Sequence, residues 1–337
     1  MKTRYLAALL LIPAFVTPAN AAEPKLPRDG WVSWQAPAVD NAPAWCCWNS
    51  WRPGDVAHVP CPLDTMNSRG VGVSVGDGDR GMTTSALKVY ARTAAGKIDR
   101  LQVLAAACPV ETKTPVQELG DVQADDSARW LIARVKEGSV DAKKQESIGE
   151  HALSALAMHR GEVAGGALKA FAHDGRVDTR KSSVFWLSML RGTEGADVTS
   201  SVMFSDPEPE VRKHAAFSLS HTKSPRAAAD LIRQGNNDKV GEVRAQAWFW
   251  LAQTGAAEAE KAIAAALRKD ADDHVREQAI FALSQLPDDR AAKALIEVAQ
   301  DQTLPREQRK RAVFWLSQSE SDTAQAYLEK VLARNAR

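Results

Sequence analysis

The sequence predicts a mainly α-helical protein: an α-solenoid of paired helices preceded by a small β-rich N-terminal domain. Three observations support this prediction. The C-terminal two thirds repeat with a period of about 32 residues. Residues 23–120 lack this period and contain segments in which apolar and polar residues alternate. The same segment holds all four cysteines, which suits a small domain that needs covalent cross-links.

The N-terminal segment, 1–22, has the composition of a secretory signal peptide. Lys2 and Arg4 precede an apolar stretch at 5–16, and Ala19-Asn20-Ala21 supplies small residues for cleavage. This stretch is too short to span a bilayer, and no later segment holds about 18 apolar residues in succession. We therefore expect an exported protein, periplasmic or secreted, without stable membrane insertion, whose cysteines meet an oxidising environment.

Two alternating segments within the β-rich domain, 23–120, predict a hairpin. Residues 87–93 and 98–104 alternate on either side of a turn at 94–97. Residues 31–34 and 45–51 are further candidate strands. A helix at 125–137 is expected to lead into the solenoid, which we place at 121–337.

The cysteines are expected to form two disulfides. They are Cys46, Cys47, Cys61 and Cys108. Adjacent residues have Cα atoms about 3.8 Å apart, less than the usual disulfide separation, so a bond between the first two is not expected. Two pairings remain open: 46–61 with 47–108, or 46–108 with 47–61. A redox or metal-dependent centre in this region, with His58 as a further ligand, is the alternative, although no C-x-x-C motif is present.

Five segments in the solenoid align with one another. They begin at arginines and reach a leucine at the end of the second turn, for example R-K-H-A-A-F-S-L-S from Arg212 and R-E-Q-A-I-F-A-L-S from Arg276. The leucines recur at a constant interval, except that the last interval is one residue longer: Leu187, Leu219, Leu251, Leu283 and Leu316. Each segment has helical spacing, and a second helical stretch lies between neighbouring segments. Two helices per repeat make an α-solenoid.

The segment D-P-E-P-E-V-R-K-H-A-A-F-S-L from Asp206 resembles the HEAT repeats. More narrowly, V-R-A-Q-A-W-F-W-L-A-Q and R-K-R-A-V-F-W-L-S-Q resemble a group of exported bacterial HEAT proteins. The resemblance implies a ladder in which an Asp, and an Arg six residues later, bond between neighbouring repeats. Those positions are Asp174/Arg180, Asp206/Arg212, Asp238/Arg244 and Asp270/Arg276. The fifth unit departs from the pattern, since Thr303 precedes Arg309. A helix with Ala324, Tyr327, Leu328 and Val331 on one side should cap the array.

One position of each repeat is aromatic where the general HEAT pattern is polar. Two residues before the leucine, at about 160° from it on a helical wheel, stands a phenylalanine in all five units: Phe185, Phe217, Phe249, Phe281 and Phe314. Four residues further on the same side come Met189, His221, Gln253, Gln285 and Gln318. Such a stripe forms a binding groove for a protein or extended peptide, or packs between neighbouring helices. Both readings remain open.

The other candidate motifs favour structural roles. Gly72-Val73-Ser74-Val75-Gly76 matches G-x-S-x-G but lacks the flanking strand and helix of a hydrolase. Asp77 and Asp79 resemble the start of a calcium loop, but position 88 is a lysine. HEAT-type iron hydroxylases carry His-Glu dipeptides, and this sequence has none among its seven histidines. Phycobilin-lyase relatives share the repeat, but no residue here selects a bilin. No metal and no cofactor are expected.

Together these features predict an exported, non-catalytic interaction scaffold. Its partner is a protein or extended peptide bound along the concave face, at Phe185, Phe217, Phe249, Phe281, Phe314, His221, Gln253, Gln285 and Gln318. The formal charge of +1 gives no basic field for nucleic acid. A redox or metal-dependent factor using the cysteine region, and a structural envelope component, are the alternatives.

Overall fold

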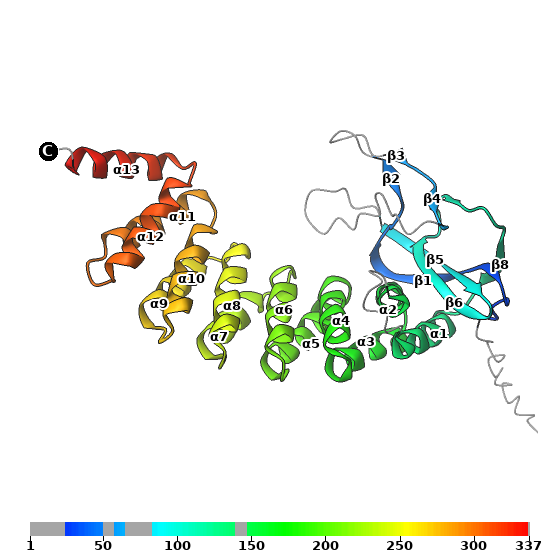
Figure 1. Cartoon of the computed structure of the whole chain (residues 1–337). Helices are drawn as coiled ribbons and strands as arrows, with labels where there is room; N and C mark the ends of the chain where they lie inside the picture. Colours follow the sequence, from blue (N-terminus) through cyan, green and yellow to red (C-terminus); the bar gives the residue numbers. More distant parts are fainter. Residues whose placement is uncertain (1–23, 50–56, 65–82, 139–146, 336–337) are drawn as a thin grey trace, which may run out of the picture.

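The fold consists of a small β region followed by an array of helix pairs (Figure 1). The computed structural model describes residues 24–49, 57–64, 83–138 and 147–335. Its strands are β1 (Gly30–Pro43), β2 (Trp48–Asn49), β3 (Ala57–His58), β4 (Cys61–Pro62), β5 (Thr83–Ala94), β6 (Lys97–Ala105), β7 (Val110–Glu111) and β8 (Val116–Asp121). Its helices are α1 (Ala124–Glu137), α2 (Ile148–Met158), α3 (Glu162–Asp174), α4 (Val177–Leu190), α5 (Gly192–Ser205), α6 (Pro209–Ser220), α7 (Ala227–Asn237), α8 (Gly241–Gln253), α9 (Ala259–Lys269), α10 (Asp273–Ser284), α11 (Asp288–Gln300), α12 (Arg306–Ser317) and α13 (Asp322–Asn335).

The main sheet has four strands in the order β6-β5-β1-β8. The predicted hairpin is confirmed, because β5 and β6 pair antiparallel across a two-residue turn. Ala95 and Gly96 both have positive φ, 51° and 76°, as the turn types that match strand twist require. The long strand β1 contains the predicted 31–34 segment and pairs antiparallel with β5 and parallel with β8.

The four cysteines join the shorter strands to one edge of this sheet. Cys46 pairs with Cys108 and Cys47 pairs with Cys61, the second of the two pairings that the sequence left open. Adjacent residues in an extended chain point to opposite sides, so the two bonds bind two different neighbours. The sulfurs pack in a separate small core with buried Trp31, Leu63 and Tyr90.

The helix pairs lie side by side along an arc, with the strands at one end and α13 at the other (Figure 1). The aligned segments form the second helix of each pair: α4, α6, α8, α10 and α12. These second helices pack on one another more extensively than the first helices do, as expected on the inner side of a curved stack. We call their solvent-facing side the inner face. The predicted α-solenoid is confirmed, and α13 packs on α11 and α12 as a cap.

An Asp–Arg ladder ties successive pairs together, as the resemblance implied. Arg212 donates to both carboxylate oxygens of Asp238 in the next unit at 2.7 and 2.9 Å, and to the backbone carbonyl of Asp206 in its own unit. The same bidentate bond joins Arg180 to Asp206 and Arg244 to Asp270. These arginines are mostly buried, where a fixed bidentate carboxylate is most effective.

The ladder stops after the third rung. Arg276 still donates to the carbonyl of Asp270, and it also binds Asp273 of its own helix. Asp301 follows α11 as Asp270 follows α9, but it binds Arg268 and the backbone of Thr303 instead of Arg276. The α10–α12 step therefore has no rung among the described residues.

The sheet and the first helices share one hydrophobic core. Trp34, Val89, Leu153 and Leu187 belong to a single buried cluster. A polar chain crosses this core: the Trp34 indole N–H donates to Ser127 Oγ at 2.8 Å, and Ser127 Oγ lies 2.8 Å from His159 Nε2. His159 Nδ1 lies 2.7 Å from the Ala155 carbonyl, so it carries the proton and Nε2 accepts from the serine hydroxyl. The β region is thus joined to the solenoid by packing and by satisfied hydrogen bonds.

Candidate functional site

The five phenylalanines of the repeats form a stripe along the inner face. Each comes from the same position of successive second helices, α4 to α12. The first four are half-buried, and Phe314 is 54% exposed. The stripe therefore lies partly between helices and partly open to solvent.

The rings touch in an unbroken series. Phe185 and Phe217 are stacked with centroids 6.0 Å apart and planes within 2°, and Phe249 and Phe281 are stacked at 5.6 Å within 12°. Between these two pairs, the Trp250 indole contacts Phe217 at 4.9 Å and Phe249 at 4.7 Å. In the same way Trp315 joins Phe281 and Phe314, at 5.0 and 5.2 Å. Aromatic pairs at these distances attract one another beyond simple burial.

The series has a period of two units. The residue after the phenylalanine is tryptophan in the first, third and fifth units (Trp186, Trp250, Trp315) and small in the second and fourth (Ser218, Ala282). Where it is tryptophan, in α8 and α12, the indole contacts the phenylalanine of the preceding unit; where it is small, the two phenyl rings stack face to face. This alternation is visible in the sequence, but its consequence depends on how neighbouring helices pack.

The first ring of the series comes from the β region. The Trp45 indole lies 5.4 Å from that of Trp186, which contacts Phe185 at 5.0 Å. Nine rings in contact, the aromatic ladder, thus run from Trp45 to Phe314. Trp45 belongs to the core that the sheet shares with the helices.

One edge of the aromatic ladder is neutral and polar. Gln253 and Gln318 are exposed, and Gln285 and Met189 are half-buried. His221 is exposed and lies with its ring 4.7 Å from that of Phe217 and 5.8 Å from that of Trp250. The predicted residues four positions beyond each phenylalanine therefore lie along the stripe.

The opposite edge is charged, and its charges pair with one another. Lys213 binds Glu210 at 2.9 Å, and Glu242 binds His274 of the next unit at 3.0 Å. Further along, Glu277 pairs with Arg311, and Glu307 with Lys310. Burial, with a smaller contribution from Lys181, lowers the pKa of His214 to about 4, so this histidine is neutral near pH 7. The inner face therefore combines aromatic rings and amides with charges that are already compensated.

Comparison with known proteins agrees with this architecture. A model of HEAT repeats matches residues 166–248 and 236–317. Residues 166–317 of this chain are HEAT repeats. A search of curated proteins found none that matches it in sequence.

Among solved structures, this chain is similar to human deoxyhypusine hydroxylase, with 18% identity and a TM-score of 0.32, over 60% of this chain and 76% of that one. It is also similar to the complex of CpcE and CpcF of phycocyanin lyase from Nostoc, with 22% identity and a TM-score of 0.36, over 46% of this chain and 97% of that one.

The remaining candidates from the sequence lie in the cysteine region or outside the described residues. All four cysteines are paired, so thiol chemistry there would require prior reduction. Residues 24–49, 57–64, 83–138 and 147–335 contain no group of three or more His, Cys, Asp or Glu placed to hold a metal ion. Within the same ranges no helix is long and apolar enough to cross a membrane. Residues 1–22, Gly72–Gly76, Asp77 and Asp79 lie outside the described residues, as does the side chain of His58.

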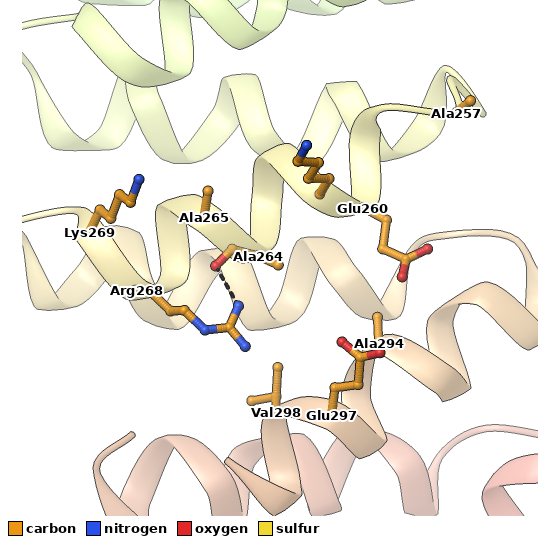
Figure 2. Close-up of a pocket in the computed structure, with 10 residues that line it drawn as sticks. Ala257, Glu260, Ala264, Ala265, Arg268, Lys269, Ala294, Glu297 and Val298 are labelled. Atoms are coloured by element: carbon orange, nitrogen blue, oxygen red, sulfur yellow. Dashed lines mark hydrogen bonds between the residues drawn. The ribbon is translucent and has the colours of Figure 1, made fainter. Parts of the chain in front are cut away.

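The outer side of the HEAT array has a hollow of about 560 Å³ between α9 and α11. Figure 2 shows its alanine floor and its charged rim, with Arg268 bonded to the Ala264 carbonyl. Arg268 is also held by Asp301. The rim mixes basic Lys261 and Lys269 with acidic Glu260 and Glu297, and no buried polar group that lacks a partner among the described residues points into it.

Proposed function

We propose that this protein is an exported, non-catalytic scaffold, periplasmic or secreted, that binds an extended segment of a partner polypeptide along the inner face. One observation carries the proposal: nine aromatic rings in contact run the length of the array, and none of the five phenylalanines is fully buried. HEAT repeats typically mediate contacts between proteins.

The geometry of the face suits an extended chain. Neighbouring helices pack about 8–10 Å apart, and an extended polypeptide advances about 3.3 Å per residue. Each unit therefore spans about three residues of a bound segment. The phenyl and indole rings supply apolar contact, while Gln253, Gln285 and Gln318 each offer a donor and an acceptor to a peptide backbone.

The charge pattern favours a segment of low net charge. The acidic and basic side chains along the charged edge already pair with each other. A charged ligand would have to break those pairs. An apolar or aromatic segment gains from the rings without that cost.

Site-specific photocrosslinking tests the proposal. A benzophenone side chain at Gln253 should capture a polypeptide from the exported fraction, whereas the same group at Lys261 on the outer side should not. The double variant F249S/F281S should lose the captured product. The variant F249L/F281L keeps apolar volume without the rings and should lose most of it.

Stability measurements separate binding from folding. If F249L/F281L folds with a melting temperature near that of the wild type and captures as much product, the rings are not a binding surface. If both double variants unfold at much lower temperature than the wild type, the rings are part of the core and the proposal fails.

A further inference from the structure

Glutamines flank the phenylalanine on both sides in the third and fourth units. In α8 one glutamine stands three residues before Phe249 and another four residues after it, and α10 repeats this arrangement around Phe281. Both positions lie within about 60° of the phenylalanine around the helix, so they share its face, and they lie about 4.5 and 6 Å from it in opposite directions along the helix axis. We call these four residues the amide quartet: Gln246, Gln253, Gln278 and Gln285.

The arrangement belongs to these two units. The same two positions hold Ser182 and Met189 in the first unit, His214 and His221 in the second, and Arg311 and Gln318 in the fifth. The amide quartet therefore surrounds one stacked pair of rings, Phe249 and Phe281, whose centroids lie 5.6 Å apart.

The amide quartet offers hydrogen-bonding groups that a ligand can reach. Gln253 is exposed, and the other three glutamines are half-buried. The Gln285 amide donates to the neighbouring Ser284 Oγ at 3.1 Å, whereas the other three side chains form no hydrogen bond with any described residue. Their unpaired amide atoms are not enclosed by protein, in contrast to Oε1 of Gln308. These amides are therefore available to a bound molecule.

Two rows of amides at this separation match a single extended chain that runs across the helices. The rows lie about 10.5 Å apart, the rise of seven helical residues. A strand inside a sheet has its two neighbours about 4.8 Å away on either side, or about 9.6 Å in all. Its N–H and C=O groups point alternately to the two sides, and each glutamine offers both a donor and an acceptor. A chain lying over the stacked rings would bond to both rows.

We infer that the amide quartet holds the backbone of an extended, uncharged segment from both sides, so that this part of the inner face recognises main chain and not sequence. The inference rests on the proposed function for the source of the segment and specifies how it is bound. A helical partner fits less well, because its backbone groups already bond to one another. A sugar also fits less well, since it would need an open ring face and those of Phe249 and Phe281 are turned towards each other.

The test uses the full-length protein and a capped nine-residue peptide of alternating serine and leucine, labelled with a neutral dye and followed by fluorescence anisotropy. Methylating the backbone nitrogens of all the leucines, or of all the serines, removes the donors from one side of the extended chain. A chain that used a single row could reverse its direction and keep that row. Recognition from both sides therefore predicts that each methylated peptide binds the wild type about tenfold more weakly than the parent peptide.

The variant Q246M/Q278M removes one row and keeps the length of the side chains. It should bind the parent peptide about tenfold more weakly and should not distinguish it from the methylated peptides, which excludes a steric effect of the methyl groups. Gln325 is exposed on α13, and the control Gln325→Met should leave all three affinities unchanged.

The inference is overturned if the parent peptide shows no saturable binding, if the wild type binds all three peptides equally, or if Q246M/Q278M still distinguishes them. Displacement of the peptide by chitotetraose at a lower concentration than by unlabelled peptide would identify a glycan as the ligand and also overturn it. Equal binding of the three peptides, together with a product captured at Gln253 and lost in F249L/F281L, would refute this inference and leave the proposed function standing.

Discussion

The indole of Trp45 packs 5.4 Å from that of Trp186, so a residue of the β region supplies the first ring of the aromatic ladder in the solenoid. Trp45 is 8% exposed and lies beside the cysteine that follows it. The disulfide of Cys46 with Cys108 thus fixes the backbone next to this ring. The β region acts as the N-terminal cap of the ladder.

Replacing Trp45 by alanine should destabilise the whole protein. Removing a buried indole costs about 3–5 kcal/mol of unfolding free energy, and the loss includes the contact across the joint. Phe314→Ala at the exposed end should cost less than about 1 kcal/mol, in line with surface substitutions. Denaturant unfolding followed by circular dichroism compares the two; equal losses would mean that Trp45 is not part of the joint.

Breaking one rung of the Asp–Arg ladder should lower the unfolding free energy substantially. The matched control is Arg276, the arginine at the same repeat position that binds no described aspartate of the next unit. Arg212→Ala leaves the buried Asp238 carboxylate uncompensated, which costs about 3–5 kcal/mol. Arg276→Ala removes bonds only to the Asp270 carbonyl and to Asp273, whose side chain is exposed, and should cost about 1 kcal/mol. The chemical denaturation midpoints give the comparison, and similar shifts for both variants would show that the rung adds nothing.

The stability of the fold should fall as the pH drops from about 6.5 to about 4. Burial lowers the pKa of His159 to about 4, well below its ordinary value of 6.5. The unfolded chain therefore binds a proton in this window while the folded chain does not, and each such histidine removes up to about 1.4 kcal/mol of unfolding free energy per pH unit. The lowered pKa of His214 likewise makes the unfolding free energy fall as the pH drops through this range.

Unfolding free energies at pH 7 and pH 5 measure the effect. His159→Gln should lower the stability at pH 7 and reduce the pH slope by the contribution of one proton, while the share from His214 remains. An unchanged slope in this variant would show that the buried histidine does not titrate on unfolding.

Gly235 makes room for a tryptophan between the two helices of one pair. A Cβ at this residue would lie 2.5 Å from the ring of fully buried Trp248, so Gly235→Ala forces the helices apart. We expect a loss of about 1–3 kcal/mol. Gly166 is exposed in α3 with no atom within 4 Å of its Cβ position, and Gly166→Ala should stabilise by about 0.5–1 kcal/mol. Differential scanning calorimetry should show melting temperatures moving in opposite directions; a parallel shift would contradict the steric explanation.

The sequence predicts the elements whose pattern is local. The five leucines at a regular spacing give the helix pairs, and the alternation on both sides of Ala95-Gly96 gives the hairpin. The Asp–Arg ladder was implied by the resemblance to HEAT repeats, and Arg212 and Asp238 keep the same separation as the partners of the other two rungs.

Features that depend on how distant segments meet could not be predicted in this way. The disulfide pairing depends on β4 lying parallel to β7, which places Cys61 opposite Val110. The place of Trp45 in the aromatic ladder depends on the sheet packing against α4. A hollow beside Phe314 lies between α10 and α12, and Gln308 in its lining stands where a helical pattern suggests only a buried apolar side chain.

Because tryptophan alternates with a small residue, the structural pattern of the array repeats every two units and not every unit. Phe185 and Phe249 begin equivalent stacks two units apart, so the structural unit that can be copied is two helix pairs long. Deleting or duplicating two neighbouring units keeps every ring in register with its neighbours. Deleting a single unit would place two helices with tryptophan next to each other, or two helices with small residues. Either change would interrupt the aromatic ladder. Chains of this kind should therefore lengthen and shorten by even numbers of repeats.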